Sequence, residues 1–350
     1  MATDASTAVV RLSDLQHNQE AICFAALVKK ERGTDKHDKP YVKCHFRDKQ
    51  GVFVAPFWSS NALREEAESW QEGAAYRLRV RGDWNVRYGM QLQVLEAREA
   101  TADDTAEGYN FYDLVESSEQ DPEALFQKVR GFVEKGIDEE PLKRLVLNIL
   151  DAHADLFKKM PAAQNFHHAY TGGLIEHVWS MTRTACWLAD HYARYYYQLN
   201  PPLNKGVVIA STVLHDIGKL RELDYHPVEA KYTTEGCLVG HVLLGRDLVR
   251  DEAKKIEGFP EETLMLLEHA ILAHHGKREF GAPVLPQTLE ALLVSYIDDL
   301  DAKMNAGVRQ LLTSKTDGEF TEKVFALDNR RLYKGIPVES ILDDEGPDLS

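Results

Sequence analysis

The sequence contains only four cysteines, and no two of them stand in Cys-x-x-Cys spacing. This scarcity argues against a disulfide framework, a zinc ribbon and an iron-sulfur cluster. No stretch approaches the roughly 20 apolar residues that a membrane span needs. Residues 1–12 also lack the basic start and apolar run of a secretion signal. We therefore expect a cytoplasmic protein with reduced thiols and no membrane partner.

The charges and the histidines are spread unevenly along the 350 residues. The net charge is -15, yet residues 1–100 hold 15 Lys and Arg against 14 Asp and Glu, so the excess acid lies in the remainder. An acidic chain repels nucleic acid, but the first hundred residues are close to neutral, so this repulsion does not exclude binding there. Eleven of the 14 histidines lie between His153 and His275. A chain of this length predicts two domains, with histidine chemistry in the second.

The first hundred residues show the pattern of a small β-barrel. β-Branched and aromatic residues alternate with polar ones in short runs that turn signals separate. Three strands, a helix and two further strands are the order of a five-stranded OB barrel, a fold that commonly binds single-stranded oligonucleotides. We expect strands over residues 21–30, 40–47, 52–58, 75–86 and 90–98, and a helix over 62–71.

The segment ATADDTAEG is composed of small, polar and acidic residues and is typical of a linker. From Asp121 onward, apolar residues recur at helical spacing. We expect helices beginning at Asp121 and over residues 139–159, 174–197, 205–223, 238–256, 261–275 and 287–305. The second domain is therefore predicted to be an all-α bundle. The predicted division is an OB domain over 1–100, a linker over 101–120, the helical domain over 121–335 and a flexible acidic tail over 336–350.

Histidines and aspartates recur in the helical half at intervals of roughly one helix and its loop. Each candidate would then come from a different helix, and a bundle can direct all of them into one cavity. Imidazole and carboxylate ligands suit Mn, Fe, Co or Zn. Because a carboxylate has two oxygens, the adjacent His-Asp pair could bridge two cations that activate a water for phosphoester hydrolysis. The predicted ligands are His177, His215, Asp216, His241, His274, His275 and Asp298.

Neighbouring residues are predicted to support these ligands. Lys219 lies four residues after His215, hence on the same face of a continuous helix. Its cation would hold a substrate phosphate or neutralise the transition state, which makes Asp216 and Lys219 the predicted catalytic residues. Pairing of the lysine with an acid is the alternative. Glu176, beside His177, is expected to hydrogen-bond a ligand.

Three aspartates close together compete for the last ligand position. Helical phase favours Asp298, which shares a stripe with Ala291 and Val294. Asp299 is expected to point elsewhere. Asp301, about one turn from Asp298, is expected to support the site from behind the ligands.

Substrate contacts are predicted in both halves of the chain. His167 and His168 are candidates in the helical half, where they would bind substrate or help the metals, with a cap or loop role as the alternative. On the barrel, Arg77, Arg79 and Arg81 alternate with apolar residues, which places three guanidinium groups along one strand face. Cations combined with base stacking bind single strands without regard to sequence, although a solvated face is the alternative for these arginines. The candidate stacking residues are Tyr41, Phe53, Phe57, Trp58, Trp84 and Tyr88.

Six segments of the helical half carry a resemblance to a known family. They are PAAQNFHHAYTGGLIEHVWSM (161–181), VLHDIGK (213–219), YTTEGCLVGH (232–241), ILAHHGKREFGAP (271–283), SYIDDLDAKMN (295–305) and GEFTEKVFALDNRRLYKG (318–335). These segments resemble those of the YhaM-type 3′-5′ exoribonucleases of the HD phosphohydrolase superfamily, and the predicted ligands match its H...HD...D signature and the extra ligands of its two-metal members. The resemblance implies an OB domain followed by an HD domain, as inferred above. It also implies hydrolysis of single-stranded RNA from its 3′ end to nucleoside 5′-monophosphates, with Mn preferred over Mg.

Two other functions fit the same residues. One is a phosphodiesterase or phosphohydrolase acting on nucleotides or on short or cyclic oligonucleotides, for which long RNA would be no better a substrate. The other is a nucleic-acid-binding regulator whose metal site is only structural. Single-stranded DNA as a partner, and assembly into a homo-oligomer, are left open by the sequence.

Overall fold

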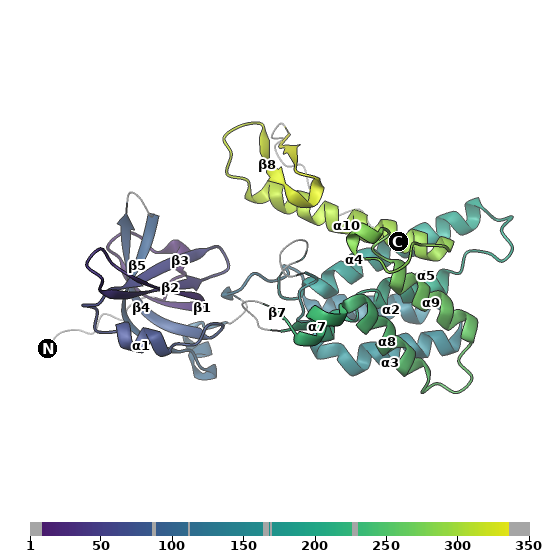
Figure 1. Ribbon diagram of the computed structural model, residues 1–350, viewed down its shortest axis with the longest axis horizontal. Coiled ribbons are helices and arrows are strands. Elements are labelled where there is room, and N and C mark those ends of the chain that lie inside the picture. The colour runs from purple at the N-terminus through teal and green to yellow at the C-terminus, as the bar shows by residue number, and fades with distance from the viewer. Residues whose placement is uncertain are drawn as a thin grey trace.

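The computed structural model describes residues 9–85, 89–110, 113–163, 168, 170–225 and 230–335. A β-barrel forms one end of the molecule and a helical region the other (Figure 1). The predicted substrate contact His167, the aromatic candidate Tyr88 and the predicted tail over 336–350 lie outside the described residues.

Five strands close into a barrel in the order β1-β2-β3-β5-β4. All neighbours are antiparallel except β3 and β5, which meet in parallel at Val54 and Gln91. This order is that of an OB barrel, so the predicted fold of the N-terminal region is confirmed. The strands are β1 (Glu20–Thr34), β2 (Pro40–Arg47), β3 (Val52–Phe57), β4 (Ala75–Asn85) and β5 (Gly89–Glu99), with α1 (Arg64–Ser69) between β3 and β4.

Alternation along the strands explains the barrel. In β4, Leu78 and Val80 are fully buried and face the interior, while the arginines between them face outward. Phe46, Phe57 and Tyr76 are also buried there and surround Trp70, which follows α1. These aromatic rings fill the interior of the barrel and close its end beneath α1.

The helical region buries its own core, to which most of its longer helices contribute. The predicted helical bundle is confirmed, and two short two-stranded sheets that the sequence did not predict are added to it. None of the described helices is both long and apolar enough to cross a membrane. The elements are α2 (Pro122–Gly136), α3 (Glu140–Phe157), α4 (Gly173–Tyr195), α5 (Lys205–Leu214), α6 (Lys219–Glu222), β6 (Leu223–Asp224), β7 (Lys231–Tyr232), α7 (Thr234–Val239), α8 (His241–Ala253), α9 (Glu261–Ala273), α10 (Leu289–Thr313), β8 (Phe320–Val324) and β9 (Arg330–Tyr333).

Two helices that were predicted to be continuous are interrupted. The predicted helix over 205–223 ends at Leu214, passes through a turn and resumes as α6. A Cβ on Gly218 would collide with the carbonyl oxygen of His241, so the glycine in this turn allows α8 to approach closely. The predicted helix over 238–256 is likewise split, at Gly240, whose φ is +79°. Both interruptions adjoin predicted ligands.

The segment between the two regions is packed rather than extended. Its residues 102–107 form a short 3₁₀ helix, and Arg98 of β5 pairs with Asp104 in that helix. Further on, Leu114 and Val115 are buried against the outside of the barrel, where Phe24 is among their neighbours. The connecting segment therefore fastens to the barrel before the chain enters the helices.

Candidate metal centre

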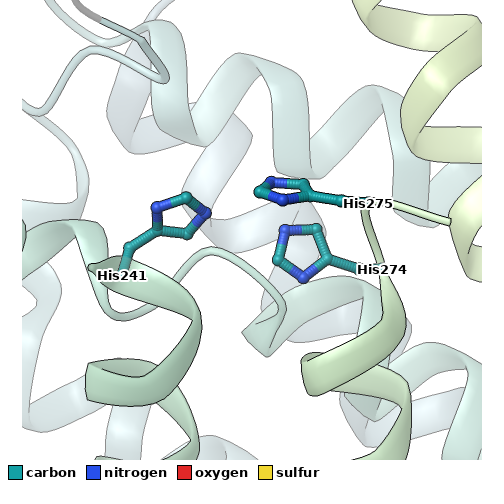
Figure 2. A group of neighbouring side chains, drawn as sticks. All are labelled: His241, His274 and His275. Atoms are coloured by element: carbon teal, nitrogen blue, oxygen red, sulfur yellow. The ribbon is translucent and has the colours of Figure 1, made fainter. Parts of the chain in front are cut away.

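Six imidazole rings form a continuous row through the helical region. Successive ring centroids along its first four members are 5.0–5.4 Å apart. The last three members form a triangle with centroids 4.1–5.7 Å apart, in which His241 starts α8 and His274 and His275 follow α9 (Figure 2). We call these last three the histidine triangle. In order, the rings belong to His168, His177, His215, His274, His241 and His275.

The carboxylate of Asp216 lies between two groups of histidines. Its Oδ2 atom is 3.4 Å from Nε2 of His215. Its Oδ1 atom is 3.4 Å from Nε2 of His241 and 3.8 Å from Nε2 of His274. Asp216 thus presents one oxygen to each group.

Asp298 of α10 completes the group on the Oδ2 side. Its Oδ1 atom lies 3.3 Å from Nε2 of His177 and 4.0 Å from Nε2 of His215. We call these three residues the first ligand group, because one ligand atom from each lies within 4.8 Å of the others. The atoms of the histidine triangle meet the same condition. The structure therefore brings together all seven residues that the sequence predicted as ligands.

The rings of both groups are fixed by hydrogen bonds on their Nδ1 atoms. Nδ1 of His215 donates to the carbonyl of Thr212 at 2.8 Å, and Nδ1 of His274 to that of Ile271 at 2.7 Å. A ring that donates from Nδ1 exposes the lone pair of Nε2, which is the atom that faces Asp216. The backbone of α5 and α9 thus selects the tautomer that can bind a cation.

A carboxylate does the same for His241. Oε1 of Glu222, at the end of α6, lies 2.9 Å from both Nδ1 and the backbone nitrogen of His241. Glu222 is buried, and the sequence analysis did not identify it. Its position seven residues after His215, two helical turns along the same segment, is the signal that could have found it.

A second carboxylate supports His177. Oδ2 of Asp301 lies 2.7 Å from Nδ1 of His177, which agrees with its predicted place behind the ligands. Ser180 of α4, which the sequence analysis also missed, donates to Oδ1 of Asp301 at 2.5 Å. His168 is buried in the same network, 3.2 Å from Asp301 and 2.9 Å from the hydroxyl of Tyr170. This burial argues against the predicted substrate contact and favours a bracing role for His168.

Lys219 lies at the first residue of α6 rather than within the predicted long helix. Its Nζ atom is 2.8 Å from Oδ2 of Asp216 and also donates to the carbonyl of Ala162. Burial alone would lower the pKa of Lys219, but the Asp216 carboxylate raises it, so the ammonium stays charged. Lys219 therefore forms an ion pair with Asp216, which was the alternative prediction for this lysine. The pair lies beside the cavity described below.

Glu176 precedes His177 in α4. It lies beside Tyr170, whose pKa is raised by burial and then by this carboxylate. Its predicted supporting role stays a prediction.

Several polar atoms of the cluster are buried and have no hydrogen-bond partner within the described part of the chain. Each such atom costs roughly 1–3 kcal/mol when it is left unsatisfied. A cation-binding site requires several such unpaired atoms close together, because the cation takes the place of their hydrogen-bond partners. Imidazole nitrogen and carboxylate oxygen are together a donor set for divalent transition metals. The residues therefore fit a metal. The atoms are Nε2 of His215, Oδ1 of Asp216, Nε2 of His241, Nε2 of His274 and Nδ1 of His275.

The charges of the cluster also favour a cation. Burial and neighbouring imidazoles lower the pKa of His274 and His275, so both rings are neutral at pH 7. Burial opposes protonation of His177, but its hydrogen bonds with Asp298 and Asp301 raise its pKa to about 9. The buried negative charges of Asp216, Asp298 and Asp301 are therefore stabilised by positive charge close to them, and a bound cation would supply it.

A cavity of about 160 Å³ opens beside the cluster. Asp216, Lys219 and Asp298 contribute to its lining, as does Phe280, which is 53% exposed. Asp299 lines it as well, although helical phase predicted that this residue points elsewhere, and it pairs with Lys303 at 2.6 Å. A substrate can therefore reach the ligand cluster from solvent.

On the barrel, the three arginines face outward from β4 as predicted, but each already has an acidic partner. We call them the arginine ladder. Two of the acids come from β1 and β5, the strands beside β4, and the third from the 3₁₀ helix over 102–107. The pairs are Arg81–Glu20, Arg79–Glu96 and Arg77–Glu107. The predicted RNA contact by the ladder stays a prediction.

The aromatic candidates differ in their exposure. Phe57 is 1% exposed in the barrel core, so its prediction as a stacking surface is wrong. Tyr41 and Trp58 lie together outside the core, with ring centroids 5.1 Å apart, and Trp58 is 46% exposed. Lys43 places its Nζ 5.3 Å from the centroid of Tyr41. We call Tyr41, Lys43 and Trp58 the barrel platform. Trp84, at the end of β4, is 59% exposed.

Comparison with protein families agrees with this geometry. Residues 174–303 match the model of the family described as "HD domain", which includes all seven predicted ligands. This part of the helical region is therefore similar to an HD domain. Residues 120–221 also match the model TraI_2, described as "Putative helicase".

Two solved structures show a distant likeness over part of this chain. A domain of replication protein A from Methanococcus maripaludis is 13% identical, with a TM-score of 0.22, and the match covers 26% of this chain and 93% of that one. The second OB-fold domain of the same protein, solved by NMR, is 14% identical with a TM-score of 0.21, and the match again covers 26% and 93%. The order of the strands, rather than these likenesses, identifies the barrel.

Proposed function

We propose that this chain is a metal-dependent 3′-5′ exoribonuclease that hydrolyses single-stranded RNA to nucleoside 5′-monophosphates. The proposed site holds two divalent ions, with Mn²⁺ preferred. The observation that carries the proposal is the position of Asp216, which presents one oxygen to the first ligand group and the other to the histidine triangle. The similarity to an HD domain supports the reaction class. The sequence segments that resemble YhaM-type enzymes support RNA as substrate and the direction of degradation.

The residues of the chain prepare the site for this reaction. Divalent ions bound there would supply Lewis acidity and a nucleophilic water at neutral pH. Asp216 is held in place by Lys219 at 2.8 Å, so its two oxygens keep fixed directions. Lys219 also brings a positive charge to the cavity wall, where it attracts a phosphate oxygen and stabilises charge that develops on it. The fixed Nδ1 bonds of the histidines mean that little reorganisation is needed during the reaction.

The mouth of the cavity suits the last nucleotide of a strand. The exposed ring of Phe280 lies at this cavity, and Nζ of Lys277 lies 5.2 Å from its centroid. An aromatic face next to a cation is the combination that binds a nucleobase and its phosphate. We therefore assign to Phe280 the stacking of the terminal base.

The barrel supplies the grip on the rest of the strand. The barrel platform combines Tyr41 and Lys43 of β2 with the ring of Trp58, the residue that follows β3. Stacking on such rings tolerates any base, as an exonuclease of broad sequence range requires. In this proposal residues 1–100 hold the RNA and residues 121–335 cleave it.

One observation favours a second candidate function. Each arginine of the ladder is already paired with an acid, which leaves the barrel with fewer free cations for a long polyanion. A phosphodiesterase for short or cyclic oligonucleotides needs no such grip. The two candidates differ in whether the rate of hydrolysis rises with the length of the strand.

Product analysis on RNA of increasing length tests the proposal. The full chain is incubated with Mn²⁺ and single-stranded RNA labelled in its 3′-terminal nucleotide. We expect the label to appear at once as a nucleoside 5′-monophosphate, with a larger kcat/KM for longer strands. Loss of that length dependence in Trp58→Ala would assign the grip to the barrel platform. Internal fragments as first products, or equal rates on dinucleotides and long RNA, would contradict the exoribonuclease proposal.

A further inference from the structure

The β8–β9 hairpin, which follows α10, projects from the helical bundle (Figure 1). Its residues 320–334 hold four Lys and Arg against two Asp and Glu, whereas the net charge of the whole chain is -15. The proposed reaction gives this segment no role. A basic hairpin on an acidic chain points to a negatively charged ligand.

One face of the hairpin carries two aromatic rings next to two cations. Arg331 and Tyr333 are two residues apart in β9 and therefore share a face. Lys323 pairs with Arg331 across the hairpin, and Phe320 pairs with Tyr333, with ring centroids 5.5 Å apart. All four side chains are exposed, and we call them the hairpin platform. Phe325, in the 3₁₀ helix between the two strands, is not part of it.

The opposite face of the hairpin is fixed to α10. Leu332, between the two platform residues of β9, packs against Gly307 of that helix. Glu322, the acid of β8, accepts hydrogen bonds from Gln310 of α10 and from Ser314, both at 2.9 Å. The acid is therefore bonded on the side of α10, and the platform keeps its cations and its rings.

The two cations of the platform repel each other. Lys323 and Arg331 are directly opposite in the register of the hairpin, and like charges in that position are destabilising. Within the described part of the chain neither of them forms an ion pair, and Nε of Arg331 donates to the backbone carbonyl of Thr321 at 3.0 Å. An anion placed between the two side chains removes the repulsion. A phosphate group has oxygens for both of them.

The turn of the hairpin lies close to the cavity. The pKa of Asp328, in that turn, is lowered chiefly by its hydrogen bond with Arg330, and the charges of Lys303 and Lys277 lower it further. Lys303 pairs with Asp299, which lines the cavity, and Lys277 lies beside the aromatic ring at the cavity mouth. The platform begins three residues beyond Asp328, a distance of about 10 Å along an extended strand.

We propose that the hairpin platform binds single-stranded RNA next to the nucleotide that is being removed, with its cations on phosphates and its rings on bases. Cations combined with exposed rings bind single strands without regard to sequence. The barrel platform has the same design, because Tyr41 and Lys43 are also two residues apart in a strand and a second ring lies 5.1 Å from Tyr41. The placement rests on the proposed function, which puts the 3′ end of the strand in the cavity.

Equilibrium binding of a 5′-labelled single-stranded RNA to the full chain tests the platform, in EDTA so that no RNA is hydrolysed. Each phosphate contact contributes about 0.7 to the slope of log K against log salt concentration. The double variant Lys323→Ala/Arg331→Ala should therefore flatten this slope by about 1.4. The control Lys254→Ala/Lys255→Ala removes two exposed lysines that pair with Asp251 and Glu252, and it should leave the slope unchanged. An unchanged slope in the platform variant would overturn the proposal.

The rings require a different readout from the cations. Tyr333→Ala should weaken binding by at least about 5-fold without changing the salt slope, because a stacking contact releases no counterions. Tyr333→Phe, which keeps the ring, should bind as the wild type does. Circular dichroism verifies that all variants are folded. Equal affinities of Tyr333→Ala and the wild type would remove the rings from the contact.

Hydrolysis separates this inference from the proposed function. With Mn²⁺, the double variant should lose kcat/KM on long RNA and keep the wild-type rate on a dinucleotide, which is too short to reach the platform. Wild-type rates on long RNA in the double variant would refute the platform and leave the nuclease proposal standing. A chain whose salt slope depends on the platform but which releases no nucleoside 5′-monophosphate would contradict the proposed function alone.

Discussion

A single oxygen of Glu222, Oε1, accepts two hydrogen bonds from His241, one from the ring Nδ1 and one from the backbone nitrogen, both at 2.9 Å. Because α8 begins at His241, the carboxylate also satisfies a backbone N–H that has no partner within the helix. Burial would raise the pKa of Glu222, but the bonds from His241 lower it, so the group is a carboxylate at neutral pH. Glu222 thus sets both the position and the tautomer of His241.

This relationship predicts that Glu222→Ala weakens the binding of one ion more than the other. With Nδ1 released, the ring of His241 can turn away from Asp216, and loss of such support costs roughly 10- to 100-fold in metal affinity. We expect the metal content measured by mass spectrometry to fall from two ions per chain toward one, with the tighter ion retained.

The matched control for this prediction is Asp301→Ala, which removes the corresponding support from His177. It should weaken the ion held by the first ligand group and leave the one at the histidine triangle. Equal effects of both variants on both ions would show that the two carboxylates act only through general stability.

Asp216 should couple metal binding to folding. A ligand at 100 times its Kd stabilises the native state by about 2.7 kcal/mol, which for a domain of this size raises the melting temperature by roughly 5–10 °C. We expect Mn²⁺ to produce such a rise in the wild-type chain, and Asp216→Asn to abolish both the rise and the hydrolysis of phosphodiesters. The control is Asp299→Asn, on a carboxylate that lines the same cavity but pairs with Lys303. A rise that survives in Asp216→Asn would remove this residue from the site.

Local patterns were sufficient to predict the strands and most of the helices. Period-two alternation separated Leu78 and Val80 from the arginines between them, and both side chains are buried in the barrel. Helical phase selected Asp298 as the ligand candidate, and Asp298 lies 3.3 Å from His177, although the same phase misplaced Asp299, which lines the cavity. The acids that pair with the arginine ladder were not predictable in this way. They come from other strands and from residue Glu107, and only the closed barrel brings them near.

The features that the sequence analysis missed depend on contacts between distant segments. Nothing local in VLHDIGK indicates that the helix must stop, because the reason is the close approach of His241 to Gly218. Glu222 likewise gains its role only when that same approach brings α8 over α6. The helix break at Gly218 and the position of His241 near Asp216 therefore have the same cause. The glycine leaves room for α8, and His241 at the start of α8 can then reach Asp216.

Phe280 should affect the recognition of the terminal base rather than the chemistry. Stacking of a base on an aromatic ring contributes about 1–3 kcal/mol. We therefore expect Phe280→Ala to raise KM for RNA by roughly 5- to 150-fold, with little change in kcat. Hydrolysis of a phosphodiester that has no base, such as bis(4-nitrophenyl) phosphate, should change far less. Phe325→Ala, on a similarly exposed ring of the β8–β9 hairpin, is the control. A fall in kcat on both substrates would instead place Phe280 in the support of the metal ligands.

Acid should weaken the junction between the barrel and the connecting segment. Two hydrogen bonds from Arg98, at 2.5 and 2.8 Å, and one from the backbone of Thr101 at 2.8 Å hold the pKa of Asp104 well below its usual value. A carboxyl whose pKa is lower in the folded state than the roughly 3.9 of the unfolded chain stabilises the fold above that pH. The contribution disappears as the pH falls through the folded-state value. Asp104→Asn should therefore melt several degrees below wild type at pH 7, and the difference should shrink below about pH 4. Calorimetry from pH 7 to pH 2 measures it, with the exposed neighbour Asp103→Asn as control. A difference that stays constant over this range would mean that the charge of Asp104 does not stabilise the junction.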